Sequence, residues 1–175
     1  SYALLTNASL ITKTYFPRMI IPLAQLGVHC LDFLIGFCCL MILMPFMGGS
    51  FGLTFLALPF FAIQLLFLSS AFALWLSAIT VQFRDVRFVV PFMVQFGMFV
   101  SPVGYSSDLI PNELQWIYFL NPLVGIIDGF RFSLLGVAST HFIHSIASSL
   151  IVTVTLFLSG YFYFRKKERA FADII

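Results

Sequence analysis

The ionisable residues that could carry chemistry in this 175-residue chain are few and lie far apart in the sequence. His29 and Asp32 are three positions apart inside an apolar run, so they would share one face of a helix. Such a pair inside a membrane is a candidate proton relay, since intramembrane ionisable groups are candidate functional sites by default. A pair that is merely satisfied inside a helix bundle has the same pattern. Both interpretations remain open at this stage.

The motifs that usually mark catalysis or metal binding are missing from the sequence. His141 and His144 are one helical turn apart, but a zinc site would also need carboxylate or thiolate ligands. The three cysteines, Cys30, Cys38 and Cys39, form no CxxC pair. The sequence contains no HExxH, no GxSxG and no GxxxxGK[ST]. We therefore expect no catalytic residues, no metal site and no cofactor bound by this chain.

The composition is that of a membrane protein. Hydrophobic residues make up 61% of the chain and charged residues 9%, against roughly 45–50% and 25% in soluble domains. A soluble fold of this size could not remove so much apolar surface from water. The composition excludes a disordered chain, a coiled coil and a disulfide scaffold. With a net charge of +2 and no basic stripe, it also argues against nucleic-acid binding.

The apolar runs predict an all-α, polytopic helical bundle. A span needs about 20 apolar residues, and the turn signal at residues 45–52 divides the longest run. We expect four full spans, over about residues 19–46, 53–81, 88–103 and 142–164. Residues 106–140 alternate short apolar pieces with polar residues, prolines and glycines. This pattern predicts a re-entrant helical hairpin, because irregular backbone at membrane depth needs cover from protein or a water-filled cavity.

The basic residues predict the orientation of the spans. They lie in every second connection, at Lys13 and Arg18, at Arg84 and Arg87, and at residues 165–169. The alternate connections, at residues 48–52 and 104–140, carry a single basic residue. By the positive-inside rule the first set and the C-terminus are cytoplasmic. The hairpin would then lie on the outer side.

The segment before the first predicted span could form a short surface helix. Asn7 can cap it, and Leu10, Ile11 and Tyr15 would share one apolar face before Pro17 ends the turn. Such a helix could lie on the lipid surface, or it could dock in a groove of a partner protein. The residues alone favour neither interpretation.

Two further groups of polar residues are candidate functional elements. Arg84, Asp85 and Arg87 form a tight basic link that could simply anchor the topology. Asp128 and Arg131 are three positions apart on a predicted half-helix, where an ion pair could act as a structural clamp in a gate.

Five ordered motifs make the chain recognisable. They resemble the permeases of type-2 ABC transporters that export O-antigen, capsular and teichoic-acid polysaccharides. The motifs occupy residues 7–23, 83–92, 101–105, 120–131 and 163–175. One mild departure is Asp128, which stands where Glu is common in that family.

The resemblance implies a permease with six spans per subunit and two subunits per channel. Residues 1–175 would then be one transmembrane permease domain that lacks the N-terminal interface helix, the first span and most of the second. The implied partners are a separate ATPase subunit that holds ATP and Mg, a second copy forming a homodimer, and membrane lipid. The implied cargo is an undecaprenyl-diphosphate-linked glycan, moved across the bacterial inner membrane. These proteins serve capsule and lipopolysaccharide biosynthesis.

The resemblance also assigns roles to residues. The ATPase-coupling helix would comprise Asn7, Leu10, Ile11, Lys13, Tyr15, Phe16, Pro17 and Arg18. The second cytoplasmic loop would contain Arg84, Asp85 and Arg87. The outer gate would contain Pro102, Tyr105, Asn121, Pro122, Asp128 and Arg131. Two alternatives remain: a type-2 permease for a drug or another lipid, and a proton-driven carrier or polytopic membrane enzyme that uses His29 and Asp32.

Overall fold

Every regular element that the structure describes is a helix. The computed structural model describes residues 20–46, 52–83 and 85–168. Its elements are α3 (Ile20–Phe46), the 3-10 helix η1 (Leu53–Ala57), α4 (Leu58–Gln82), α5 (Val86–Val100), the 3-10 helix η2 (Ser107–Leu109), α6 (Asn112–Tyr118), α7 (Pro122–Leu135) and α8 (Phe142–Glu168). The prediction of an all-α fold is confirmed for this part of the chain.

Three stretches of helix in the described residues are long and apolar enough to cross a bilayer. They are Leu23–Phe46 (24 residues), Leu53–Gln82 (30 residues) and Phe142–Lys167 (26 residues), and they match three of the four predicted spans. Helix α5 has 15 residues, which gives a length of about 22 Å against a hydrocarbon core of about 30 Å. The fourth span and the re-entry of the hairpin therefore remain predictions.

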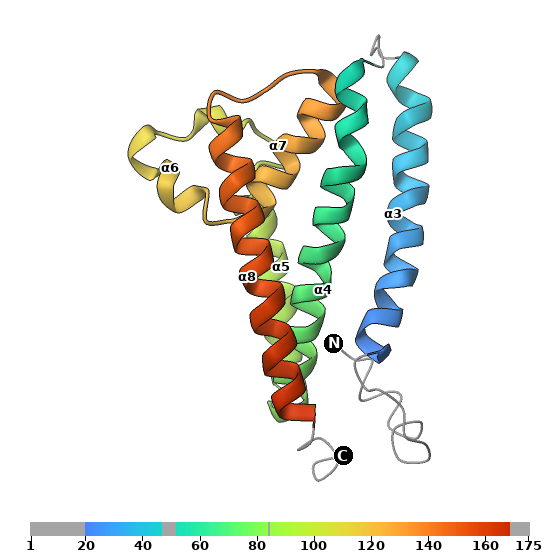
Figure 1. Cartoon of the computed structure of the whole chain (residues 1–175), viewed down its shortest axis with the longest axis vertical. Coiled ribbons are helices and arrows are strands. Elements are labelled where there is room, and N and C mark those ends of the chain that lie inside the picture. The colour runs from blue at the N-terminus through green and yellow to red at the C-terminus, as the bar shows by residue number, and fades with distance from the viewer. Residues whose placement is uncertain (1–19, 47–51, 84, 169–175) are drawn as a thin grey trace.

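Helices α4, α7 and α8 form the packed centre of the molecule (Figure 1). Leu74, Ala78 and Val81 of α4 bury themselves against Phe164 of α8. Nearby, Trp75 stacks on the Tyr163 ring with centroids 4.8 Å apart. Large side chains from two helices thus hold α4 and α8 together along the half of the bundle that ends at Arg165.

The other two long helices are peripheral. Helix α3 packs against α4 on the side away from α8, and α5 makes little contact with α4 (Figure 1). Most side chains of both helices are exposed. Apolar faces of this extent are suited to contact with lipid or with further protein.

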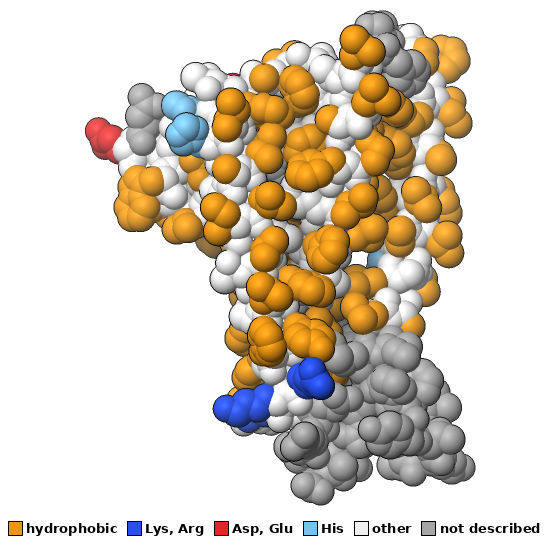
Figure 2. All heavy atoms as spheres, viewed as in Figure 1, with side chains coloured by type: hydrophobic (Ala, Val, Ile, Leu, Met, Phe, Trp, Pro, Cys, Tyr) orange, Lys and Arg blue, Asp and Glu red, His pale blue; other side chains and the backbone are white. Residues whose placement is uncertain are grey.

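The surface is apolar along the length of the bundle. Hydrophobic side chains cover the face shown in Figure 2, while Lys and Arg gather at one end, and acidic (Asp or Glu) and His side chains appear toward the other end. The basic residues of the last turn of α8 are Arg165, Lys166 and Lys167. This distribution resembles a protein whose apolar belt lies in a bilayer and whose charged ends lie at the two surfaces.

Local sequence determines where α7 begins, ends and crosses its neighbours. The Asn121 side chain accepts a hydrogen bond from the Leu123 amide at 3.0 Å, and Pro122 takes the first helical position. Gly136 ends the helix with a φ of 69°, a left-handed conformation that glycine adopts without strain. At Gly125 a Cβ atom would meet the Ser145 carbonyl oxygen, so the absence of a side chain lets α7 approach α8 closely.

Candidate functional site

The buried carboxylate of Asp128 on α7 is the centre of the candidate site. Asp128 is 2% exposed. The Ser107 hydroxyl donates to its Oδ1 and Oδ2 atoms at 3.0 and 2.9 Å, and the Ser139 hydroxyl donates to Oδ2 at 3.3 Å. We call Asp128, Ser107 and Ser139 the Asp128 cluster. It joins α7 to η2 and to the loop before α8, and hydrogen bonds offset the cost of burying the carboxylate.

Arg131 does not pair with Asp128 in the part of the chain that the structure describes. Its Nη2 atom instead donates to the carbonyl oxygen of Pro102 at 2.6 Å. The ion pair predicted from the i,i+3 spacing is therefore wrong: Asp128 binds Ser107 and Ser139, and Arg131 binds Pro102. The physical reason is that connecting segments, which sequence spacing cannot place, bring a carbonyl and two hydroxyls within reach of these side chains.

Asn121 joins the same turn from the other end of α7. While its Oδ1 atom caps the helix, its Nδ2 atom donates to the Ser101 hydroxyl at 2.9 Å. Pro102 and Ser101 are both buried. The turn that ends α5 is therefore held by one side chain at the start of α7 and by Arg131, nearly three turns later.

Tyr105 and Tyr118 connect α6 to the end of α5. The Tyr118 hydroxyl donates to the Tyr105 hydroxyl at 3.2 Å, and Tyr105 donates to the carbonyl oxygens of Phe99 and Val100 at 3.3 and 3.2 Å. Burial and the hydrogen bond to Tyr105 hold the pKa of Tyr118 well above its usual value. The phenol therefore stays neutral and keeps its donor at physiological pH.

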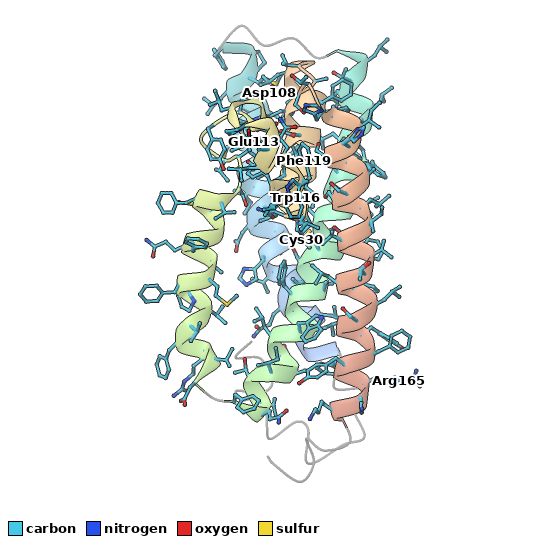
Figure 3. The ribbon with its side chains drawn as sticks, turned by 90° about the vertical axis from the view of Figure 1, so that its left-hand side faces the viewer. Cys30, Asp108, Glu113, Trp116, Phe119 and Arg165 are labelled. Carbon is cyan, nitrogen blue, oxygen red and sulfur yellow. The ribbon has the colours of Figure 1, made fainter. Side chains whose placement is uncertain are left out.

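Asp108 in η2 is exposed and contacts the loop before α8. The Thr140 amide donates to its Oδ1 atom at 2.8 Å, and the Ser106 hydroxyl donates to Oδ2 at 3.2 Å. The hydrogen bonds from Thr140 lower the pKa of the Asp108 carboxyl. Figure 3 shows Asp108, Glu113 and Phe119 near the same end of the molecule.

This arrangement is mechanical in character. The hydrogen bonds of Asp128, Arg131, Asn121 and Tyr118 join α5, η2, α6, α7 and the loop before α8. No group of three or more His, Cys, Asp or Glu side chains that could hold a metal lies within the described ranges. The network attaches η2, α6 and the turn after α5 to the packed α7.

The predicted coupling residues and the end of the C-terminal motif lie outside the residues that the structure describes. Residues 7–18 and Arg84 lie outside the described residues. Asp85 precedes α5 without a side-chain capping bond, and the Arg87 guanidinium lies 4.7 Å from the centre of the Phe88 ring. The roles predicted for these segments stay predictions.

The two histidine pairs differ in their surroundings. His29 Nδ1 lies 3.6 Å from Asp32 Oδ2, and the two side chains are 76% and 71% exposed, so this pair is outside the packed interior of the described chain. His29 and Cys30 also line a cavity of about 300 Å³ between α3 and α4. The rings of His141 and His144 are 6.5 Å apart, and His141 lies beside Phe119.

Sequence reasoning missed several members of the network. These are the serines Ser101, Ser107 and Ser139, and a buried contact in which Gln64 Nε2 of α4 donates to Ser149 Oγ of α8 at 2.8 Å. A serine in a turn carries no signal that identifies a distant partner. The polar residues in apolar α4 and α8 were the available hint, because an amide at membrane depth needs a partner.

Comparisons with known proteins agree with the resemblance drawn from the motifs. A family model described as ABC-2 type transporter matches residues 7–135. An O-antigen export system permease protein RfbA from Klebsiella pneumoniae is 29% identical over 180 aligned residues, and a second is 27% identical over 176. Each alignment covers 99% of this chain and 67% of the relative. RfbA from Myxococcus xanthus is 27% identical over 135 residues, covering 74% of this chain and 50% of the relative.

Proposed function

The chain belongs to the ABC-2 type transporter family, and on this premise we propose that it is the membrane-spanning part of an ATP-driven exporter of lipid-linked polysaccharide. Members of the family are transport subunits and not enzymes. The observation that carries the substrate class is the alignment of 99% of the chain with two proteins named as O-antigen export permeases. O-antigen, capsular and teichoic-acid glycans are the candidate cargoes, carried on undecaprenyl diphosphate.

In this proposal, one subunit hydrolyses ATP and a different subunit forms the transport path. ATP and Mg would bind a partner ATPase, and residues 7–18 would form the helix that rests on it. The apolar spans would transmit the movement of the ATPase to the hairpin formed by α6 and α7. The supporting feature is that η2 and the turn after α5 are attached to α7 by a discrete set of hydrogen bonds, which can break more readily than the packed contact of α7 with α4 and α8 can separate.

The proposed setting is the bacterial inner membrane, with the C-terminus in the cytoplasm. The Lys and Arg residues at the end of α8 support this orientation, since basic residues favour the cytoplasmic side. Helix α5 would be a nearly upright fourth span, and α6 with α7 would be re-entrant from the outer side. Two copies of a six-span subunit would enclose the path, which accounts for the exposed apolar faces of α3 and α5.

The substrate class is tested in cells that make a lipid-linked glycan. A strain that lacks its own permease would receive the protein that contains this chain together with its ATPase, and surface glycan would be measured with an antibody. We expect surface glycan with both proteins present and intracellular lipid-linked glycan when the permease is omitted. Retention of glycan inside, together with export of a drug or another lipid, would assign the chain to a different branch of the family.

A further inference from the structure

Helix α6 carries an exposed apolar patch to one side of the bundle. In Figure 1 it lies apart from α4, α7 and α8 at the end opposite Arg165. Five large side chains in and around it are between 50% and 72% exposed. We call these residues the α6 patch: Leu109, Leu114, Trp116, Ile117 and Leu120.

Polar residues lie next to the α6 patch, toward the end of the molecule. Figure 3 places Asp108 and Glu113 nearer the end of the molecule than Trp116, and Trp116 lies between them and Cys30. Figure 2 shows the same order on the part of the molecule that protrudes at the upper left, where acidic and His side chains lie above hydrophobic ones. The change from polar Asp108 and Glu113 to apolar Trp116 thus runs along the direction of the long helices.

Hydrogen bonds keep the patch in this exposed position. The Tyr118 hydroxyl donates to Tyr105, and the Thr140 amide donates to Asp108 just before α6. The Phe119 ring also lies 6.2 Å from the ring of His141. These contacts attach α6 to its neighbours near both ends and leave its apolar side exposed.

We propose that the α6 patch lies in the boundary between lipid headgroups and acyl chains and anchors the hairpin to the bilayer through Trp116. A membrane surface also changes from polar headgroups to apolar chains along the direction of the spans. A protein partner would match the α6 patch only if its own surface had the same polar and apolar order. Trp favours this boundary because its ring is apolar and its N–H needs a polar partner. Short amphipathic helices bind at this depth with their apolar side toward the chains.

The anchor gives the hairpin two different supports. α7 is held by protein alone, through Asp128 and Gly125, while α6 is held by its hydrogen bonds to protein and, in addition, by lipid. Under the proposed orientation this lipid is the outer leaflet, a point that rests on the proposed function. Movement of the gate would then drag α6 through the interface, so lipid packing in that leaflet opposes opening.

The two tryptophans of the chain, Trp75 and Trp116, allow a direct test. The full-length protein with Trp75→Phe leaves Trp116 as the only tryptophan of this region. It would be reconstituted in phosphatidylcholine vesicles that carry a nitroxide either near the headgroup or near the chain end. Iodide in the aqueous phase would report exposure to water. Trp116→Phe is the matched control, because Trp75 stacks on Tyr163 within the bundle.

The expected result is stronger quenching of Trp116 by the nitroxide near the headgroup than by the deep one, with weak quenching by iodide. Strong iodide quenching without nitroxide quenching would place the patch in water. Protection from both would place it against protein, such as a second copy, and stronger quenching by the deep nitroxide would place it inside the hydrocarbon. Each of these three results overturns the proposal.

Two precautions keep the test decisive. If Trp75→Phe does not fold, the difference between the wild type and Trp116→Phe gives the same signal from Trp116. The measurement uses neither ATPase nor glycan. Its failure therefore leaves the exporter proposal standing, and a failure of export leaves the depth of Trp116 unaffected.

Discussion

The Ser107 hydroxyl donates to both oxygens of the Asp128 carboxylate, at 3.0 and 2.9 Å, although the two residues are 21 positions apart. This contact brings η2 against α7 and gives the buried Asp128 side chain hydrogen-bond partners. Within the described residues, η2 is therefore attached to α7 through these hydrogen bonds and not through an ion pair between Asp128 and Arg131. Changes at this carboxylate should act on the whole hairpin.

Replacing Asp128 tests this attachment. Asp128→Ala leaves the hydroxyls of Ser107 and Ser139 without this acceptor, and the loss at the buried Ser107 costs about 1–3 kcal/mol. We expect a lower unfolding temperature in detergent, with a smaller loss for Asp128→Asn, which keeps one acceptor oxygen. Asp32→Asn, at an exposed side chain, is the control. Equal melting of Asp128→Ala and the wild type would show that the contact adds no stability.

Asn121 allows its two roles to be separated. Asn121→Asp keeps the oxygen that caps α7 but removes the Nδ2 donor to Ser101, and Asn121→Ala removes both. We expect Asn121→Ala to cost about 1 kcal/mol more than Asn121→Asp, the usual value of a helix cap. Chemical denaturation of the two variants measures the difference. Equal free energies of unfolding would mean that the cap contributes nothing here.

Close packing of α7 on α8 predicts a glycine requirement at position 125. In Gly125→Ala the new Cβ would lie 2.6 Å from Ser149 Cβ and meet the Ser145 carbonyl oxygen. We expect destabilisation of about 1–3 kcal/mol from overpacking. Gly97→Ala on α5 is the matched control, because no atom lies within 4 Å of its Cβ position. There the change should stabilise the helix by roughly 0.5–1 kcal/mol, and loss of stability in both variants would contradict the packing argument.

The lowered pKa of Asp108 predicts a pH dependence. Because the pKa is lower in the folded state, the contact with Thr140 contributes stability above the ordinary carboxyl value. That contribution is lost as pH falls through the lowered pKa. The difference in melting temperature between the wild type and Asp108→Asn should therefore be constant down to about pH 4 and shrink below it. A difference that persists unchanged in stronger acid would contradict this assignment.

The helices could be predicted from the sequence because lipid makes charge and turn residues unusually informative. The predicted helix over residues 19–46 corresponds to α3, which covers Ile20–Phe46. The helix ends differ by a few residues where apolar sequence runs past the final hydrogen bond, as at residues 101–103 after α5.

The contacts of the candidate site could not be predicted in the same way. Helical spacing relates Asp128 only to residues one turn away, such as Arg131, whereas its acceptor atoms are used by serines on two connecting segments. Likewise, nothing local distinguishes the Pro102 carbonyl, which Arg131 contacts 29 positions away. Such pairings depend on how the chain reverses, and this is decided by the packing of α7 in the bundle.

The dependence on a partner ATPase is the central claim, and transport in sealed vesicles tests it most directly. The permease would be reconstituted with its ATPase and a radiolabelled lipid-linked glycan, and glycan reaching the far side would be measured with and without ATP. We predict that glycan crosses the membrane only when permease, ATPase and ATP are all present. When Lys13 and Arg18 are both changed to Glu, we predict that glycan transport is lost and that ATP hydrolysis is no longer coupled to transport. Glycan that crosses in vesicles without the ATPase would contradict the account.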